Sequence, residues 1–118
     1  MTLGSSTTKV EISGYTFEIG TLTEKESSEL LSSLIVLDDQ ERIISSKSHS
    51  IAMALKKIND IDFDSIIENT DQIPEGINSL VSKKIFFIKA LQTNIVNRLF
   101  EKYTELNVDL NDDDSKKK

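Results

Sequence analysis

The chain has 118 residues, of which 37% are hydrophobic and 29% charged, and its formal net charge is −6. The absence of cysteine excludes disulfides, thiolate metal sites and a thiol nucleophile, and a single histidine excludes metal sites built from several histidines. The acidic balance disfavours nucleic-acid partners, whose binding depends on Lys and Arg beside phosphates. The length and apolar content predict one domain with one modest core.

The ends of the chain are polar, and no apolar run is long enough to cross a membrane. The first eight residues lack the charged start and apolar stretch of a signal peptide. We expect residues 1–8 to be a flexible arm, residues 9–106 to be a single α+β domain, and residues 107–118 to be a disordered charged tail. No membrane partner is expected.

Alternation of apolar and polar residues around Gly14 predicts a β-hairpin at Lys9–Ile19. Apolar residues take every second position on each side of the glycine: Val10, Ile12, Tyr15, Phe17 and Ile19. Because two strands alone are marginally stable in water, this hairpin must lie on a helix, join another sheet edge or pair with a partner chain.

A helix is predicted to begin at Thr23, because Thr23-Glu24-Lys25-Glu26 fits a capping box. An apolar stripe at three- and four-residue steps follows, as is typical of an amphipathic helix: Leu30, Leu31, Leu34, Ile35 and Leu37. We expect Asp38 and Asp39 to end this helix, since carboxylates are unfavourable near the negative end of the helix dipole.

Residues 38–50 leave two alternatives open, because residues 41–44 fit either one helical turn or a short strand. The serines that follow predict a loop. A second helix is predicted over about residues 50–58, and Asn59-Asp60 is expected to end it.

The remaining chain is expected to be acidic and irregular over residues 59–74, with one helical turn at Asp64–Asn69. Pro74 is predicted to open a last helical region that extends to about Leu106. One uniform helix of that length would exceed the diameter of a compact domain, so we expect a break where Thr93 caps the second half; the alternative is a helix that packs on another subunit. The predicted fold class is α+β and mostly α, with an N-terminal β-hairpin followed by three to four helices.

Two patterns resemble chemical sites. Asp60, Asp62 and Asp64 resemble the start of a calcium loop, but Ser65 and Asp71 stand where such a loop needs glycine and glutamate. A solvated acidic loop is the favoured interpretation. His49 lies among serines, yet neighbours in sequence do not make the geometry of a catalytic triad.

Phosphate binding is not predicted either, because the four glycines are too dispersed to form a phosphate loop. The positive charges of the C-terminal helical region form either a solvated face or a surface for acidic partners, including the 60–75 loop of a second copy. The sequence therefore predicts no enzyme: no catalytic, cofactor-binding or metal-binding residue, and no small-molecule substrate.

The most informative feature of the sequence is a surplus of apolar residues around Phe86-Phe87. With Ile85 and Ile88 they form four large consecutive apolar residues, and one helix face covers only part of that set. This helix is either buried centrally in its own domain or packed with one flank on a neighbour. The predicted partner-binding residues are apolar hairpin positions and aromatic residues of the C-terminal region: Val10, Ile12, Phe17, Ile19, Phe86, Phe87, Phe100 and Tyr103.

Four pieces of the chain carry a family resemblance: the hairpin Val10–Ile19, Leu22-Thr23 before a Glu-rich helix, the segment Ile51–Asp60, and the segment Ile95–Leu106. In this order they resemble small tail and baseplate assembly proteins of tailed bacteriophages, of the baseplate-hub assembly or tail assembly chaperone type.

The resemblance implies a non-enzymatic protein that acts through protein–protein contacts in virion assembly, as a structural subunit or as a chaperone. The implied partners are other tail or baseplate proteins or copies of itself. The implied location is the host cytoplasm during assembly, with the virion as the location of a resident subunit. The alternative is a cytoplasmic regulatory or adaptor module of antitoxin-like type, outside any virion.

Overall fold

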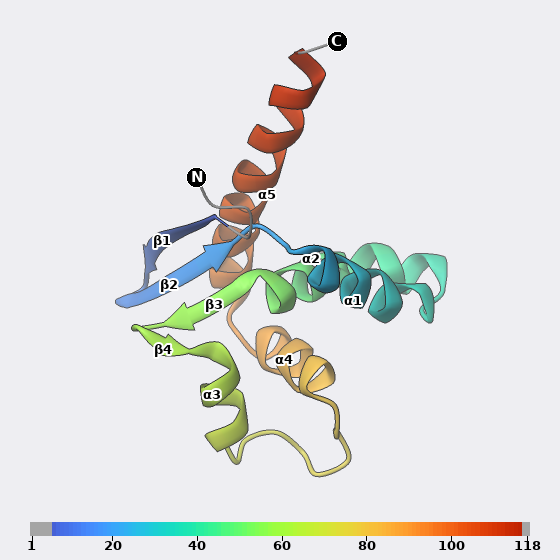
Figure 1. Cartoon of the computed structure of the whole chain (residues 1–118). Coiled ribbons are helices and arrows are strands. Elements are labelled where there is room, and N and C mark those ends of the chain that lie inside the picture. Colours follow the sequence, from blue (N-terminus) through green and yellow to red (C-terminus); the bar gives the residue numbers. More distant parts are fainter. Residues whose placement is uncertain (1–5, 117–118) are drawn as a thin grey trace.

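The computed structural model describes the backbone of residues 6–116 and the side chains of residues 6–107. Figure 1 shows a four-stranded antiparallel sheet with helices around it. This is the predicted α+β, mostly helical fold class, with five helices in the described part of the chain instead of three or four. In chain order the elements are β1 (Thr7–Ile12), β2 (Tyr15–Gly20), α1 (Glu24–Ile35), α2 (Asp39–Ala54), β3 (Leu55–Ile58), β4 (Ile61–Asp62), α3 (Phe63–Asn69), α4 (Leu80–Lys89) and α5 (Thr93–Lys116).

The predicted N-terminal hairpin is present as β1 and β2, with Val10 opposite Phe17. Ser13 and Gly14 both have positive φ, 53° and 86°, as a two-residue hairpin turn requires. Strand β1 begins at Thr7, two residues before the predicted domain boundary, and Thr7 lies opposite Gly20. Most of the predicted flexible arm, residues 1–5, lies outside the described residues.

The prediction of a helix over residues 50–58 is wrong, because α2 ends at Ala54 and Leu55–Ile58 forms strand β3. Strand β3 pairs antiparallel with β2 and continues through the turn Asn59-Asp60 into β4. The amide of Asn59 donates to the Thr16 carbonyl at 2.7 Å, and its Oδ1 accepts from the Thr16 amide at 2.9 Å. Hydrogen bonding to β2 therefore overrides the local helical spacing, and the N-terminal hairpin joins a larger sheet.

The loop predicted at residues 45–50 is also wrong, because α2 is continuous from Asp39 to Ala54. Asp38, which was expected to help end the preceding helix, instead caps α2 by accepting a hydrogen bond from the Glu41 amide. Serine hydroxyls in this segment hydrogen-bond to the helix backbone: Ser48 Oγ donates to the Ser45 carbonyl at 3.1 Å. Burial of the second half of α2 stabilises the helix where local propensity is poor.

The capping box at Thr23 and the break before α5 are confirmed. Thr93, however, is the first residue of α5, and the Gln92 carbonyl accepts the first helical hydrogen bonds. The prediction that Pro74 opens a helix is wrong, because α4 begins at Leu80. Ser79 caps this helix: its hydroxyl accepts a hydrogen bond from the Ser82 amide, and a proline ring offers no such side-chain acceptor.

Helix α5 is longer than the sequence predicts. It continues from Thr93 to Lys116, well into the segment 107–118 that was expected to be a disordered tail. Figure 1 shows its C-terminal part extending beyond the sheet. No helix within residues 6–116 combines the length and the apolar character needed to cross a membrane.

The hydrophobic core lies between one face of the sheet and helices α2 to α5. Its largest fully buried side chains come from two strands and four helices: Phe63, Ile19, Ile51, Leu55, Ile67, Ile88 and Leu99. Helix α1 is the one helix in the described part of the chain without a buried residue. With the start of α2 it forms a helical hairpin that extends away from the sheet (Figure 1).

Candidate partner-binding surface

The most exposed large apolar side chains of the described residues lie together at the end of the α1–α2 helical hairpin. We call this set the hairpin tip: Leu31, Ile35, Val36, Ile43 and Ile44. Their side chains are 68–80% exposed, whereas the next most exposed apolar residue, Ile61, is 55% exposed. Apolar surface of this kind in one place marks an interaction site.

The tip is exposed because α1 carries more apolar residues than one helix face can bury. Leu30 and Leu34 are partly buried, while Leu31 and Ile35, one turn apart, are exposed. On α2, Ile43 and Ile44 lie in the part of the helix that projects beyond the core. The five residues of the tip therefore surround the end of the hairpin on more than one side.

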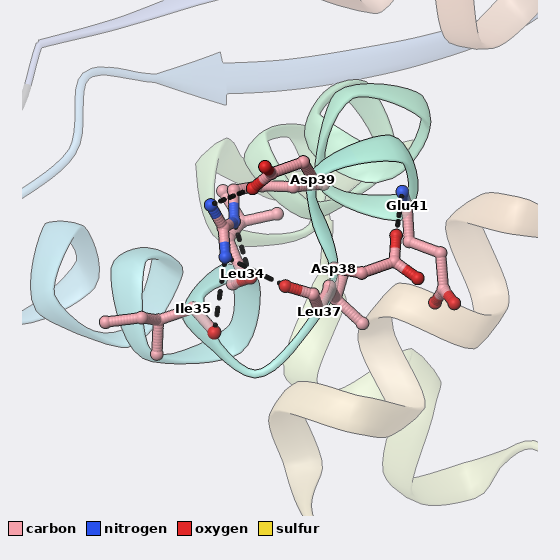
Figure 2. Close-up of polar contacts among 7 residues, drawn as sticks. Leu34, Ile35, Leu37, Asp38, Asp39 and Glu41 are labelled. Atoms are coloured by element: carbon pink, nitrogen blue, oxygen red, sulfur yellow. Dashed lines mark hydrogen bonds and ion pairs between the residues drawn. The ribbon is translucent and has the colours of Figure 1, made fainter.

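Arg42 holds the turn between the two helices in one shape. Its Nε donates to the Leu34 carbonyl at 3.1 Å, and its Nη2 donates to the Leu37 carbonyl at 2.8 Å and to the Ile35 carbonyl at 3.4 Å. Figure 2 shows these carbonyls around the turn, with Asp39 as a further partner; its carboxylate lies 3.2 Å from Arg42 Nη1.

A guanidinium at this position adds a hydrogen bond to the Leu34 carbonyl, which also accepts from the Leu37 amide, and supplies a partner for the Leu37 carbonyl in the turn. Its charge complements the negative end of the helix dipole. The planar fork of arginine can reach three carbonyls at once, which a lysine ammonium cannot do in the same geometry. The turn is therefore ordered before any partner arrives, which lowers the entropic cost of binding.

Polar contacts also attach the rest of α1 to the domain. At its start, Lys56 Nζ lies 2.5 Å from the Glu26 carboxylate, which also completes the capping box. Burial alone would raise the pKa of Glu26, but the hydrogen bonds from Lys56 and the Thr23 amide, with the charge of Lys56, lower that pKa overall.

In the last turn of α1, Ser33 Oγ lies 2.8 Å from His49 Nδ1 and donates to the Leu30 carbonyl at 2.8 Å. Since the hydroxyl proton is used on the backbone, the imidazole donates to Ser33 and does not activate it as a nucleophile. Burial, and then the charge of Lys89, lower the pKa of His49. His49 therefore links α2 to α1 through Ser33.

The hairpin residues predicted to bind a partner lie in the core of this chain instead. Val10, Ile12, Phe17 and Ile19 are all buried, with exposed fractions of 7% or less. Their side chains face α5 and the other core helices, because the hairpin joins β3 and the sheet needs one covered face. These side chains form no part of the protein surface.

The predicted aromatic residues lie in two separate places. The Phe87 ring packs edge-on against Phe63, with ring centroids 5.5 Å apart, while Phe86 is 37% exposed. On α5, Phe100 and Tyr103 stack at 5.8 Å and are partly buried against the core. The surplus of apolar surface that the sequence indicates therefore exists mainly at the hairpin tip and only to a small extent at Phe86-Phe87.

One apolar cavity of about 400 Å³ brings two of the predicted residues together. It lies between the end of the β1–β2 hairpin, β3 and the junction of α4 with α5. Its apolar lining residues are Tyr15, Phe17, Ile58, Phe87, Leu91 and Ile95. The only polar side chains in its lining besides the Tyr15 hydroxyl are Ser13 and Gln92, so it offers no charged group for chemistry.

A second cavity, of about 270 Å³, is lined by ion pairs near the start of α1. Lys84 lies 2.5 Å from the Asp64 carboxylate, opposite the pair of Lys56 and Glu26. Each of these four charged groups has an opposite charge beside it, and the Asp62 carboxylate also lines the cavity. The two ion pairs therefore hold elements of the fold together.

Two of the three aspartates that resemble the start of a calcium loop pair with different lysines. Asp60 pairs with Lys9 at 3.2 Å from the β3–β4 turn, and Asp64 pairs with Lys84. Within the described residues, no three His, Cys, Asp or Glu side chains are placed to hold one metal ion.

The residues of the tip were not singled out from sequence, although a signal exists. Leu30, Leu31, Leu34 and Ile35 form two adjacent apolar stripes on one short helix, and Ile43-Ile44 follows the cap Asp38 within two turns. A helix with two adjacent apolar stripes has more apolar surface than one packed face can bury, so part of that surface is expected to remain uncovered.

Comparison with protein-family models, curated proteins and solved structures finds no match for this chain.

Proposed function

We propose that this chain is a non-enzymatic assembly protein that acts through protein–protein contacts at its hairpin tip. The observation that carries the proposal is the set of five large apolar side chains, each at least 68% exposed, on the two helices and the turn between them that Arg42 orders. Complete burial of such a side chain contributes about 1.5–3 kcal/mol. A partner that covers the five side chains of the tip therefore gains several times that amount of favourable binding free energy. The entropic and desolvation costs of association are then subtracted from it.

The setting that we propose is the assembly of a phage tail or baseplate, on the strength of the resemblance in residues 9–106. One of its pieces, Leu22-Thr23, leads directly into α1, the helix that carries the exposed stripe. The partners would be other tail or baseplate proteins or copies of this chain. The protein would act in the host cytoplasm during assembly and remain in the virion if it is a structural subunit.

The proposal is tested by complementation in a phage whose copy of this gene has been deleted. We expect few complete tails without the gene, normal numbers with the wild-type chain, and few again with Leu31→Asp/Ile35→Asp, counted by electron microscopy of lysates. Ile61→Asp is the matched control, because Ile61 is an exposed apolar residue of β4 far from the tip in sequence. Circular dichroism of each purified variant checks that the helices remain.

Complete tails at wild-type frequency in the deletion would contradict the proposed setting. A location of the gene outside phage or prophage genomes, away from tail-tube, sheath or tape-measure genes, would instead favour the antitoxin-like adaptor. Deletion of residues 1–20 is a poor test, because it removes the four buried hairpin residues and so disturbs folding and binding together.

A further inference from the structure

The outward face of α2 carries an acidic, an apolar and a basic residue on successive turns. Asp39, Ile43 and Lys47 are four residues apart and therefore share one face of the helix. All three are exposed; the Asp39 side chain is 95% exposed and Ile43 is 76% exposed. The face opposite, with Ser45, Ser48 and His49, is buried in the domain.

This order of charges is complementary to itself when two copies of the helix are antiparallel. A two-fold axis at Ile43 brings Ile43 against Ile43 of the second copy. The same axis places Asp39 opposite Lys47 of the second copy, and Lys47 opposite its Asp39, as an isologous interface requires. Parallel packing would oppose like charges at both ends, which is unfavourable.

Both charged residues are free to take new partners, because their present contacts are exposed and long. Asp39 meets Arg42 at 3.2 Å, and Arg42 keeps its three carbonyl partners without it. Lys47 donates to Asn97 at 3.2 Å and lies over the Phe100 ring at 5.6 Å. Exposed contacts of this kind contribute little to stability.

We infer that this face of α2 is the interface with a second copy of the chain, packed antiparallel about a two-fold axis at Ile43. The inference rests on the proposed function, in which protein covers the tip, and it assigns the α2 side of the tip to self-association. The α1 side, with Leu31 and Ile35, remains free for a different protein. A basic peptide, a membrane or a nucleic acid would complement only one of the two charges, Asp39 or Lys47, whereas a second copy of the chain complements both.

Sedimentation velocity over a concentration series tests the interface. We expect a concentration-dependent dimer for the wild type, a monomer for Ile43→Asp, because a carboxylate would face its own copy at the axis, and an unchanged dimer for the control Ile61→Asp. A wild type that stays monomeric at the highest concentration, or a dimer that Ile43→Asp leaves intact, overturns the inference.

Charge reversal tests the antiparallel register itself. Asp39→Lys alone and Lys47→Glu alone each place two like-charge contacts in the dimer, so we expect each to weaken dimerisation about tenfold or more. An equimolar mixture of the two variants restores both ion pairs in the mixed dimer, and we expect its affinity to approach that of the wild type. Lys47→Glu removes only the exposed contacts with Asn97 and Phe100, so the weaker dimer expected for this variant can be measured even if Asp39→Lys disturbs the start of α2.

A mixture no stronger than either variant alone overturns the register. The experiment is independent of the complementation test, which changes only the α1 side of the tip. A monomeric wild type with a tail defect in Leu31→Asp/Ile35→Asp would defeat the self-association and leave the proposed function standing. A dimeric wild type together with normal tails in Leu31→Asp/Ile35→Asp would defeat the proposed function alone.

Discussion

The strand hairpin β1–β2 and the helical hairpin α1–α2 place their apolar residues in opposite environments. Phe17 and Ile19 of β2 are almost completely buried, whereas Ile35 and Ile43 of the helical hairpin are more than 70% exposed. The strands are covered because β3 extends their sheet and α5 packs on it. The helices are attached through polar contacts by Glu26, Ser33 and Arg42, which leave the apolar side chains outside.

The comparison shows that apolar content does not determine which segment contacts a partner. What matters is whether the rest of the chain supplies a layer to cover it. From this contrast we expect substitutions in the strand hairpin to change folding, and substitutions at the tip to change only binding.

The largest effect is expected for Phe17→Ala. Phe17 is 2% exposed and faces the core, so the substitution removes a buried ring and leaves a cavity. We expect a loss of about 3–5 kcal/mol in the free energy of unfolding, measured by urea denaturation. Tyr15→Ala, at a half-exposed position of the same strand, is the control and should cost much less. Equal losses would show that the strand hairpin is less tightly covered than described.

An intermediate effect is expected for Arg42→Ala, which removes the arginine hydrogen bonds to the Leu34 and Leu37 carbonyls, although the Leu34 carbonyl still accepts from the Leu37 amide. We expect a loss of about 1–2 kcal/mol in the free energy of unfolding, since hydrogen bonds from a charged group are stronger than average but this one is partly exposed. Arg98→Ala, at an exposed position on α5, is the control. Arg42→Lys should recover only part of the loss, because an ammonium lacks the planar fork.

A smaller effect is expected from pH through His49. Its folded pKa lies below the ordinary value of 6.5, so the unfolded chain binds the proton first as pH falls. The contribution of His49 is fully present above pH 6.5 and is lost as the pH falls from there through the folded pKa. We expect the free energy of unfolding of the wild type to decrease more steeply over that window than that of His49→Gln. Identical slopes would contradict the burial of the imidazole on α2 beside Ser33 of α1.

The smallest effect on folding is expected at the tip. Leu31→Ala and Ile35→Ala remove side chains that are already 68% and 72% exposed. We expect changes within about 0.5 kcal/mol in the free energy of unfolding, as for ordinary surface positions. A loss near that of Phe17→Ala would mean that the tip packs within the chain, and the proposed binding surface would then be wrong.

Local signals predicted the elements whose causes are local. The capping box at Thr23 and the alternation around Gly14 each depend on residues within a few positions, and both are confirmed. The loop at residues 45–50 and the helix at 50–58 were wrong, because burial supports α2 through its serines and pairing with β2 draws Leu55–Ile58 into the sheet. The exposure of apolar residues has the same distant cause: Phe87 packs against Phe63 of another helix, whereas Leu31 stays 68% exposed.

By itself the sequence determined the fold class, the strand hairpin, the start of α1 and the presence of more apolar residues than one small core readily holds. Only the tertiary structure decided where the excess lies. A residue's apolar character and its neighbours along the chain are local properties, and they set which elements form. Exposure depends instead on which distant element packs against a face, and here β3 and α5 cover the strands while nothing among the described residues covers the end of the helical hairpin.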